Sequence, residues 1–519
     1  MSSQEAAGTQ RHAPGWDPDA LSVLLASFTG TDVPGWLHEP LRAGLGGVVL
    51  FGYNTPDAAT TRDLARQVHA IAPDALVAID EEGGDVTRIQ AADGSDLPTA
   101  WALGAIDDPD LTRRVGKALG DLLAACDIDL DLAPVLDVST DPRNPVIGTR
   151  AFGDEPALVA RHAEAFADGL HDATVGACGK HFPGHGATHV DSHTALPAID
   201  LPADDLQRTH LAPWRISPQL DAIMTAHVLV PRLGDGPASI SPWSRALLDE
   251  LAGPPGYRGL VVTDALDMAA VAADPGYQEA VVRAIEAGSH LLCLGTSIRR
   301  DEQDMLREAH DALVDAVETG RLDRAVLHAR AEETRALAHA LRERRRAGRG
   351  PDLDTALHTL RQVGAHAARR AVHAGTAHLG EGSVAVVDAR VRHDHASGSR
   401  RSTLGDILRE HGIDTVETTD MQQIPADTAQ VLVLTRLPLS DPDEQERLAA
   451  ILAARPEAII LHTGVPGAAP AHEQVVLTYG HGRAMITAAV DALRGTAGRT
   501  QTPHDQRPRN GSPREEAAR

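Results

Sequence analysis

Aromatic residues, lysine and positive charge are all in short supply in this chain of 519 residues. Phe, Trp and Tyr make up only 3% of it, so a hydrophobic core must be built from Val, Leu, Ile and Ala. The 48 basic residues are outnumbered by 73 acidic ones, and the net charge of −25 repels phosphate backbones and anionic lipid surfaces. This balance argues against nucleic acid and membranes as partners and favours a small, uncharged ligand.

Cysteine is scarce as well. Cys126, Cys178 and Cys293 lie in or beside apolar runs, with neither CxxC spacing nor the even number of a disulfide framework. We predict that all three are buried, reduced thiols. The first residues lack the basic start and apolar stretch of a secretory signal, and no run of about 18 apolar residues occurs. The sequence therefore predicts a cytoplasmic protein.

Short apolar runs alternate with helix-length segments over residues 21–341. Seven of these runs have the character of strands: 46–52, 75–80, 129–138, 176–182, 222–230, 259–266 and 290–295. Near-continuous apolar strands separated by helices are typical of a parallel sheet covered by helices. Because polar residues gather at the C-terminal ends of several runs, the pattern favours a (β/α)₈ TIM-type barrel over an open, doubly wound sheet.

A basic, proline-containing stretch at 341–362 separates the barrel pattern from a second one. There, strand-like runs alternate with amphipathic segments, which predicts a smaller α/β sandwich domain: strands at 383–389, 430–436, 457–464 and 475–480, and helices near 402–412, 443–454 and 483–494. The predicted organisation has five parts: a flexible N-terminus 1–20, a catalytic barrel 21–341, a helical linker 342–378, the sandwich 379–494 and a disordered tail 495–519.

The segment KHFPGHGATHVDSH, 180–193, is the most unusual in the chain. It places a histidine at every fourth position, namely His181, His185, His189 and His193. On a helix these rings would share one face and could ligate a metal ion. A proline and two glycines break such a helix, so we predict a loop after a strand, and no metal site.

Within this loop, Asp191 lies two residues before His193. In an extended stretch both side chains point to the same side, and a carboxylate would then fix the tautomer of the imidazole and raise its basicity. An imidazole with a pKa near 6.5 suits proton donation and recovery near neutral pH. The alternative is that Asp191 caps a turn while His193 only packs.

Asp264 directly follows the apolar run GLVVT. At a strand end in a barrel mouth it could act as a nucleophile, whereas its structural alternative is a helix N-cap. A nucleophilic carboxylate combined with an acid/base group is the machinery of retaining glycoside hydrolysis. Asp80, Arg88 and Arg150 could hold sugar hydroxyls by charge-assisted hydrogen bonds, or could be ordinary surface ion-pair partners.

Lys180 is one of only two lysines, the other being Lys117. In a chain that otherwise uses Arg as its cation, a lysine indicates a site that needs a compact point charge. His227, in the segment MTAHVLV, could line the same mouth or be a satisfied core histidine.

Six segments occur along the chain in this order: AIDEEGGDVTR, LAPVLDV, NPVIGTRAFG, KHFPGHGATHVDSH, IMTAHV and VVTDALDM. Their order and spacing, over about residues 45–270, resemble glycoside hydrolase family 3 and specifically its β-N-acetylhexosaminidase branch. The resemblance implies a (β/α)₈ barrel with Asp264 as nucleophile and His193, oriented by Asp191, as acid/base. It also implies a set of residues that bind the terminal N-acetylglucosamine: Asp80, Arg88, Arg150, Lys180 and His181, to which we add His227.

Two positions depart from the family's usual pattern. Ala187 stands where relatives usually read PGHGDT, which bears on the closed geometry of the loop. Asp85 stands where EGGRV is common, and we expect this acidic residue to affect preference on the aglycone side.

The sequence therefore predicts an exo-acting, retaining glycoside hydrolase. It would release terminal β-linked N-acetylglucosamine from cell-wall (peptidoglycan turnover) or chitin-derived fragments, with no cofactor and no metal. One alternative is a β-N-acetylglucosaminide phosphorylase on the same scaffold, because a histidine acid/base carries no fixed negative charge to repel phosphate. Another is a non-catalytic sugar-binding barrel. The second domain would serve packing or the formation of a homodimer.

Overall fold

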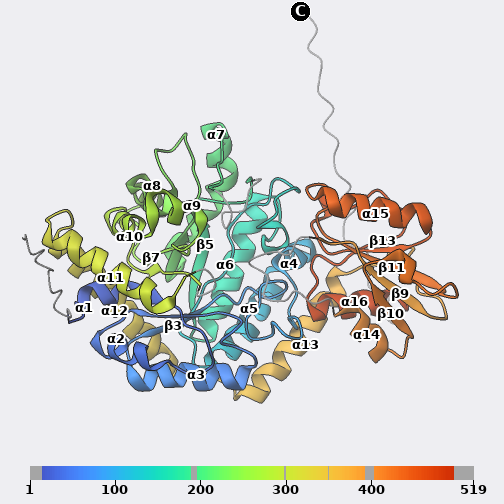
Figure 1. Cartoon of the computed structure of the whole chain (residues 1–519), viewed down its shortest axis with the longest axis horizontal. Coiled ribbons are helices and arrows are strands. Elements are labelled where there is room, and N and C mark those ends of the chain that lie inside the picture. The colour runs from blue at the N-terminus through green and yellow to red at the C-terminus, as the bar shows by residue number, and fades with distance from the viewer. Residues whose placement is uncertain (1–14, 189–195, 297–299, 349, 392–402, 496–519) are drawn as a thin grey trace, which may run out of the picture.

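The chain folds into two parts that lie side by side (Figure 1). The computed structural model describes residues 15–188, 196–296, 300–348, 350–391 and 403–495. The first part, blue to yellow in Figure 1, is a barrel surrounded by helices, and the second, orange to red, is a smaller α/β domain.

Eight parallel strands form the barrel in the order β7-β6-β5-β4-β3-β2-β1-β8. A parallel bridge between Val262 and Leu291 brings the two ends of this order together, so the sheet closes on itself. The strands are β1 (Leu24–Ala26), β2 (Gly47–Leu50), β3 (Leu76–Ile79), β4 (Leu130–Asp131), β5 (Gly176–Phe182), β6 (Ala222–Thr225), β7 (Leu260–Thr263) and β8 (Leu292–Cys293). The predicted fold class, a (β/α)₈ barrel, is confirmed.

Helices surround the barrel, and the longer ones bury their apolar faces against it. Several begin at an aspartate whose carboxylate accepts backbone N–H groups of the first turn, as Asp57 does from Thr60 at 2.8 Å. The helices are α1 (Pro18–Ser22), α2 (His38–Ala43), α3 (Ala58–Ile71), α4 (Ala100–Ile106), α5 (Pro109–Ala125), α6 (Pro156–Asp172), α7 (Ala203–Asp205), α8 (Pro242–Ala252), α9 (Ala269–Val271), α10 (Tyr277–Glu286), α11 (Glu302–Glu318) and α12 (Arg324–Ala347).

Three features of the barrel differ from the sequence prediction. Strand β1 was not among the seven predicted runs, and helix α1 begins at Pro18, inside the segment predicted to be flexible. Asp17 caps this helix, accepting the N–H groups of Asp19 and Ala20 at 3.1 Å. The predicted strand 129–138 is interrupted: β4 ends at Asp131, Pro134 has no N–H to donate, and pairing with β5 resumes in a bridge between Val135 and Lys180.

Helix α13 (Leu353–Ala371) joins the two parts. Its first half, with Leu360, packs into the barrel core, and its second half, with Ala368, packs into the core of the second domain. Helix α12 runs across the boundary predicted at 341 and ends at Ala347, so the change of domain falls after it.

The second domain is a parallel sheet with a hydrophobic core on each face. Its strand order is β10-β9-β11-β12-β13, with strands β9 (Val384–Asp388), β10 (Thr415–Thr418), β11 (Gln430–Thr435), β12 (Ile459–His462) and β13 (Val475–Leu477), and helices α14 (Leu404–Glu410), α15 (Pro442–Ala454) and α16 (Arg483–Leu493). This is the predicted α/β sandwich. Strand β10 escaped prediction because it is a half-exposed edge strand without an apolar run.

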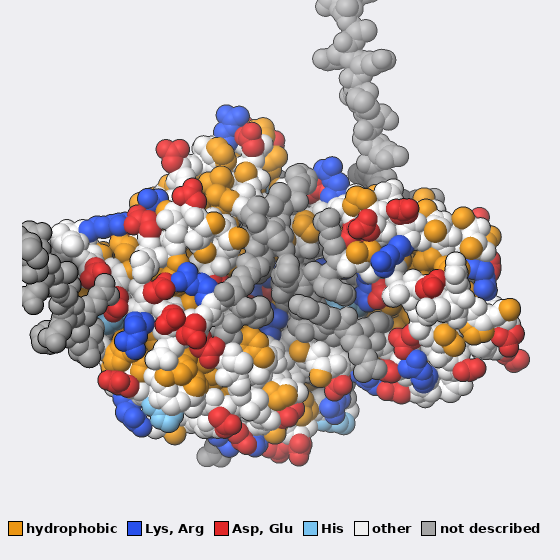
Figure 2. Space-filling model, viewed as in Figure 1, with side chains coloured by type: hydrophobic (Ala, Val, Ile, Leu, Met, Phe, Trp, Pro, Cys, Tyr) orange, Lys and Arg blue, Asp and Glu red, His pale blue; other side chains and the backbone are white. Residues whose placement is uncertain are grey.

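The three cysteines are free and buried, as predicted. Over the described residues, every helix is too short or too polar to cross a bilayer. On the face shown in Figure 2, acidic and basic side chains are interspersed among apolar ones.

Candidate active site

Five of the predicted site residues lie at one end of the barrel. Asp80 directly follows β3, Lys180 and His181 belong to the last residues of β5, His227 follows β6 and Asp264 directly follows β7. Because the strands are parallel, their C-terminal ends open onto the same mouth, the end at which barrel enzymes build their active sites.

Lys180 is the centre of a buried ion network. Its side chain is 2% exposed, and its Nζ lies 2.6 Å from Asp80 Oδ1 and 2.6 Å from Glu82 Oε1. Burial alone would neutralise such groups, but each offsets the desolvation of the other. Burial opposes the charged form of the lysine, yet the two carboxylates raise the pKa of Lys180 above its ordinary value. Burial likewise opposes ionisation of Asp80, yet Lys180 and Arg88 lower the pKa of that carboxyl.

Glu82 ties Arg150 into the same network. Arg150 donates from Nε to Glu82 Oε2 at 2.9 Å and from Nη2 to Glu82 Oε1 at 2.7 Å, a bidentate pair. Burial opposes the charge of Glu82, but Arg150 and Lys180 hold the pKa of this carboxyl far below its usual range. Sequence analysis did not select Glu82, although its place beside Asp80 in the segment AIDEEGG was an available signal. Arg88 sits at the edge of the network, with Nη2 3.5 Å from Asp80 Oδ2.

The geometry around His181 fixes its tautomer. Arg150 Nη2, which can only donate, lies 3.2 Å from His181 Nε2, so this nitrogen accepts. The proton therefore resides on Nδ1, which donates to Asp137 Oδ2 at 2.7 Å. Asp137 is fully buried, and the sequence prediction did not include it although it also ends an apolar run.

The same carboxylate shapes the loop that follows β5. Asp137 Oδ1 accepts the backbone N–H of His185 at 2.6 Å, and the Thr188 hydroxyl lies 2.8 Å from His185 Nδ1. A side chain at Gly186 would place its Cβ 1.8 Å from the Val138 carbonyl oxygen, so only glycine fits there. Thr188 thus holds the described start of the loop together, and the predicted effect of Ala187 on the closed geometry of the whole loop stays a prediction.

The predicted acid/base pair, Asp191 and His193, lies outside the described residues. Their predicted roles stay predictions. Two members of the four-histidine series are described. His181 is hydrogen-bonded to Asp137, and His185 is hydrogen-bonded to Thr188. Within the described part of the chain, no group of three or more His, Cys, Asp and Glu side chains is arranged to hold a metal ion.

Asp264 is half-buried at the mouth. Its backbone N–H donates to the Thr225 carbonyl at 3.0 Å, and its Oδ1 accepts the N–H of Ala265 at 2.8 Å. The next helix, α9, has Met268 as its N-cap, so the helix-cap alternative for Asp264 does not apply. These contacts leave a carboxylate held at a strand end, the position that a nucleophile requires.

His227 is completely buried. Its Nε2 lies 2.9 Å from the Ala265 carbonyl oxygen and its Nδ1 lies 2.6 Å from Ser239 Oγ. The ring therefore contacts the turn that carries Asp264. Sequence analysis did not single out Ser239, and the predicted contact between His227 and the sugar stays a prediction.

Asp85 faces the second domain. Its Oδ1 accepts the backbone N–H of His481 at 2.8 Å and lies 3.2 Å from His481 Nδ1, while Thr149 donates to Oδ2 at 3.1 Å. Burial opposes its charge, but His481 and Arg436 lower the pKa of Asp85 to about 2. These contacts assign Asp85 an interdomain role that sequence analysis did not foresee, and the expected effect on the aglycone stays untested.

Comparisons with known proteins show which family the sequence matches. Residues 36–337 match the model of the glycosyl hydrolase family 3 N terminal domain. A beta-hexosaminidase of Nitrosomonas eutropha is 35% identical over 327 residues, which are 61% of this chain and 90% of that protein. One from Tolumonas auensis is 38% identical over 280 residues, 52% of this chain and 82% of that protein.

Solved structures of other proteins resemble this chain over most of its length. A glycoside hydrolase family 3 beta-N-acetylglucosaminidase from Paenibacillus sp. strain FPU-7 has a TM-score of 0.79 at 30% identity, covering 93% of this chain and 97% of that chain. A beta-glucoside phosphorylase, BglX, has a TM-score of 0.74 over 93% of this chain and 92% of that chain, but at 18% identity this likeness concerns the fold alone.

The barrel, its strand-end residues and the family match define a glycoside hydrolase. The chain belongs to glycoside hydrolase family 3, and the resemblance predicted from its motifs is confirmed.

Proposed function

We propose that the chain is an exo-acting, retaining β-N-acetylglucosaminidase. The observation that carries the proposal is the buried network of Lys180, Asp80, Glu82 and Arg150 at the barrel mouth that Asp264 also borders. Such a network presents fixed charges to the hydroxyls of one sugar ring, and the names of the relatives described above favour a 2-acetamido sugar.

In the proposed reaction, the Asp264 carboxylate attacks the anomeric carbon of the terminal sugar as the bond to the leaving-group oxygen breaks. His193 donates a proton to that oxygen, and the aglycone departs as an alcohol. A water molecule, deprotonated by His193, then attacks the glycosyl ester, which releases the sugar with its original configuration and restores Asp264. Two inversions at one carbon give net retention.

The ion network contributes to the binding of the terminal sugar. Asp80 is 18% exposed, more than Glu82 or Lys180, so its carboxylate is the member best placed to accept hydrogen bonds from the sugar hydroxyls. Lys180 and Arg88 keep it charged, and Arg150 keeps His181 in the tautomer with Nδ1 protonated. Each charge is compensated before substrate arrives, so no reorganisation accompanies binding.

The natural substrates would be small cell-wall or chitin-derived fragments with a terminal β-linked N-acetylglucosamine. The cytoplasm is the compartment we favour, because Cys126, Cys178 and Cys293 are free thiols buried in the core. A homodimer through the second domain stays a prediction.

Turnover of aryl β-N-acetylglucosaminides and aryl β-glucosides by the full chain tests the proposal. We expect the 2-acetamido substrate to be preferred and its product to be formed first as the β-anomer, detected by NMR. Asp264→Ala should lower kcat by about a thousandfold or more, since no glycosyl-enzyme can form. Asp274→Asn, which alters an exposed carboxylate, is the matched control.

Two outcomes would overturn the proposal. Preference for β-glucosides would reject the sugar, and near-wild-type activity of a folded Asp264→Ala would reject the nucleophile. The same assay in phosphate buffer tests the phosphorylase alternative, because a phosphorolytic enzyme would release sugar 1-phosphate, whereas a hydrolase releases the free sugar. An inactive wild-type chain that still binds N-acetylglucosamine would favour the non-catalytic alternative.

A further inference from the structure

Ser239 is held firmly against His227. It lies in a short 3-10 turn, η5 (Ala238–Ile240), whose backbone is docked on the segment around His227. The N–H of Ala238 donates to the Val228 carbonyl at 3.0 Å, and the N–H of Ser239 donates to the Ala226 carbonyl at 3.1 Å. Both flanks of His227 therefore bind this turn, and Ser239 Oγ lies 2.6 Å from His227 Nδ1.

The partners of the ring determine where its proton resides. The Ala265 carbonyl can only accept, so His227 Nε2, 2.9 Å away, carries the proton. A neutral imidazole then accepts at Nδ1, and the donor there is the Ser239 hydroxyl. Ser239 thus selects the tautomer that binds the Ala265 carbonyl.

Ala265 is directly linked to the nucleophile. Its N–H donates to Asp264 Oδ1 at 2.8 Å, while the N–H of Asp264 is fixed to the Thr225 carbonyl at 3.0 Å. The orientation of residue 265 therefore decides where one oxygen of the Asp264 carboxylate points, and His227 holds that residue from the other side.

We propose that Ser239 and His227 form a positioning pair for the nucleophile. Ser239 fixes the tautomer and rotation of His227, whose Nε2–H holds the Ala265 carbonyl, and this turn aims the Asp264 carboxylate at the anomeric carbon. The inference rests on the proposed role of Asp264 as nucleophile. It gives His227 a positioning role beneath the sugar site, in addition to the predicted contact with the sugar.

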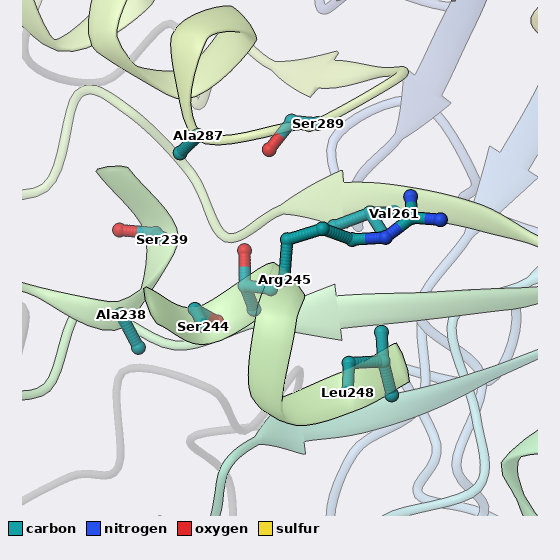
Figure 3. A pocket seen from close by; sticks show the side chains of 9 residues that line it. Ala238, Ser239, Ser244, Arg245, Leu248, Val261, Ala287 and Ser289 are labelled. Carbon is teal, nitrogen blue, oxygen red and sulfur yellow. The ribbon is translucent and has the colours of Figure 1, made fainter. Parts of the chain in front are cut away.

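The chain offers a matched control in Ser244. Ser239 and Ser244 both line a small cavity of about 10 Å³ between β6, β7 and α8 (Figure 3), and their hydroxyls point in different directions there. Ser244 Oγ is buried and has no hydrogen-bond partner among the described residues. Removing either hydroxyl makes the same change in volume at the same cavity, but only Ser239 touches His227.

Kinetics on an aryl β-N-acetylglucosaminide provide the first test. Ser239→Ala should lower kcat by about 10- to 100-fold, as expected for a misplacement of up to ~1 Å, with KM changed less than about threefold. The rate of covalent trapping by a fluorinated slow substrate, followed by intact mass, should fall by the same factor. Ser239→Thr, which keeps the hydroxyl and can direct its methyl into the cavity, should recover most of the rate, and Ser244→Ala should match the wild type.

A ¹⁵N NMR spectrum of the histidine rings tests the pair without any substrate. We expect the His227 signals, assigned by their loss in His227→Gln, to report a neutral ring protonated at Nε2 in the wild type. In Ser239→Ala this signature should change or broaden, while it should persist in Ser244→Ala. Melting temperatures check that each variant is folded.

Several results would overturn the inference. A Ser239→Ala variant with wild-type kcat, equal losses in Ser239→Ala and Ser244→Ala, or a His227 ring protonated at Nδ1 alone would each do so. If Ser239→Ala does not fold, the wild-type tautomer and the rate of Ser239→Thr still decide it. A wild-type chain without activity on β-N-acetylglucosaminides would reject the proposed function instead, since the tautomer measurement would still test the pair.

Discussion

Exchanging Lys180 for arginine is the sharpest test of the sugar-binding network. A cation larger than the lysine ammonium group does not fit at position 180, because Lys180 Nζ lies 2.6 Å from carboxylate oxygens of both Asp80 and Glu82. Glu82 Oε1 also receives Arg150 Nη2 at 2.7 Å. A guanidinium at position 180 would therefore compete with Arg150 for the same oxygen atom.

The geometry sets the size of the effect. A planar guanidinium is wider than an ammonium group, so accommodating it must displace Asp80 or Glu82 by roughly 1 Å. A displacement of that size at a substrate-positioning group costs on the order of a hundredfold in kcat/KM, equivalent to about 2.7 kcal/mol of transition-state stabilisation. Since charge is conserved, global stability should change less than activity.

Lys117→Arg is the control that the chain itself supplies. Lys117 lies on α5, its side chain is 47% exposed, and it pairs with Asp121 one turn along the helix at 2.8 Å. Such exposed pairs contribute only about 0.3–0.5 kcal/mol, and arginine can replace lysine there. We therefore expect Lys117→Arg to leave both kcat/KM and stability unchanged.

The assay compares kcat/KM of the wild type and both variants on aryl β-N-acetylglucosaminide and aryl β-glucoside. Lys180→Arg should lose about a hundredfold on the first substrate and should narrow the preference between the two sugars. If Lys180→Arg behaves like Lys117→Arg in both rate and preference, the lysine is incidental and the network does not bind the sugar.

Further predictions concern proton transfer, pH and the domain contact. His193→Ala should slow substrates with poor leaving groups far more than activated aryl glycosides, since only the former need a proton in the transition state; equal losses on both would reject an acid/base role. His69 binds Asp127 at 2.8 Å and Asp129 at 2.9 Å, and although burial opposes it, these carboxylates raise the pKa of His69 above 6.5. The charged His69 therefore stabilises the folded state below about pH 6.5, and this stabilisation is lost as pH rises through the folded-state pKa. His69→Gln should lower the free energy of unfolding by about 1–3 kcal/mol near pH 6 and by less near pH 9. A loss in urea unfolding that does not depend on pH would contradict this. Asp85→Arg should destabilise the domain contact by about 3–5 kcal/mol, because it sets a cation beside other cations in a buried site, and a melting temperature equal to that of the wild type would refute that contact.

The fold was largely predictable from the chain, because apolar strands and helix-length segments repeat regularly. The exceptions are instructive. Strand β1 is three residues long and lies beside a segment that looked flexible, and β10 is an edge strand whose half-exposed residues carry no apolar run. Pattern reasoning detects burial, so it fails where an element is too short to repeat or is not buried on either face.

The site was predictable only where chemistry coincides with a strand end. Asp80, Lys180 and Asp264 follow or end apolar runs and could be selected on that ground. Asp137 was missed although it also ends an apolar run, and Ser239 follows no such run; their hydrogen-bond partners, His181 and His227, lie 44 and 12 residues away along the chain. These pairs form only when the chain folds, and patterns in a single sequence do not indicate them.

The contact between Asp85 and His481 has a consequence for exchanging domains between enzymes of this family. The loop after β3 presents Asp80 and Glu82 to the barrel mouth and, a few residues later, presents Asp85 to the second domain. A chimera that keeps this barrel but replaces the second domain would leave the buried Asp85 carboxylate without its partner at the domain interface. It would thereby also loosen the loop after β3. The practical border for such chimeras therefore includes the loop after β3, even though it precedes the second domain by almost 300 residues.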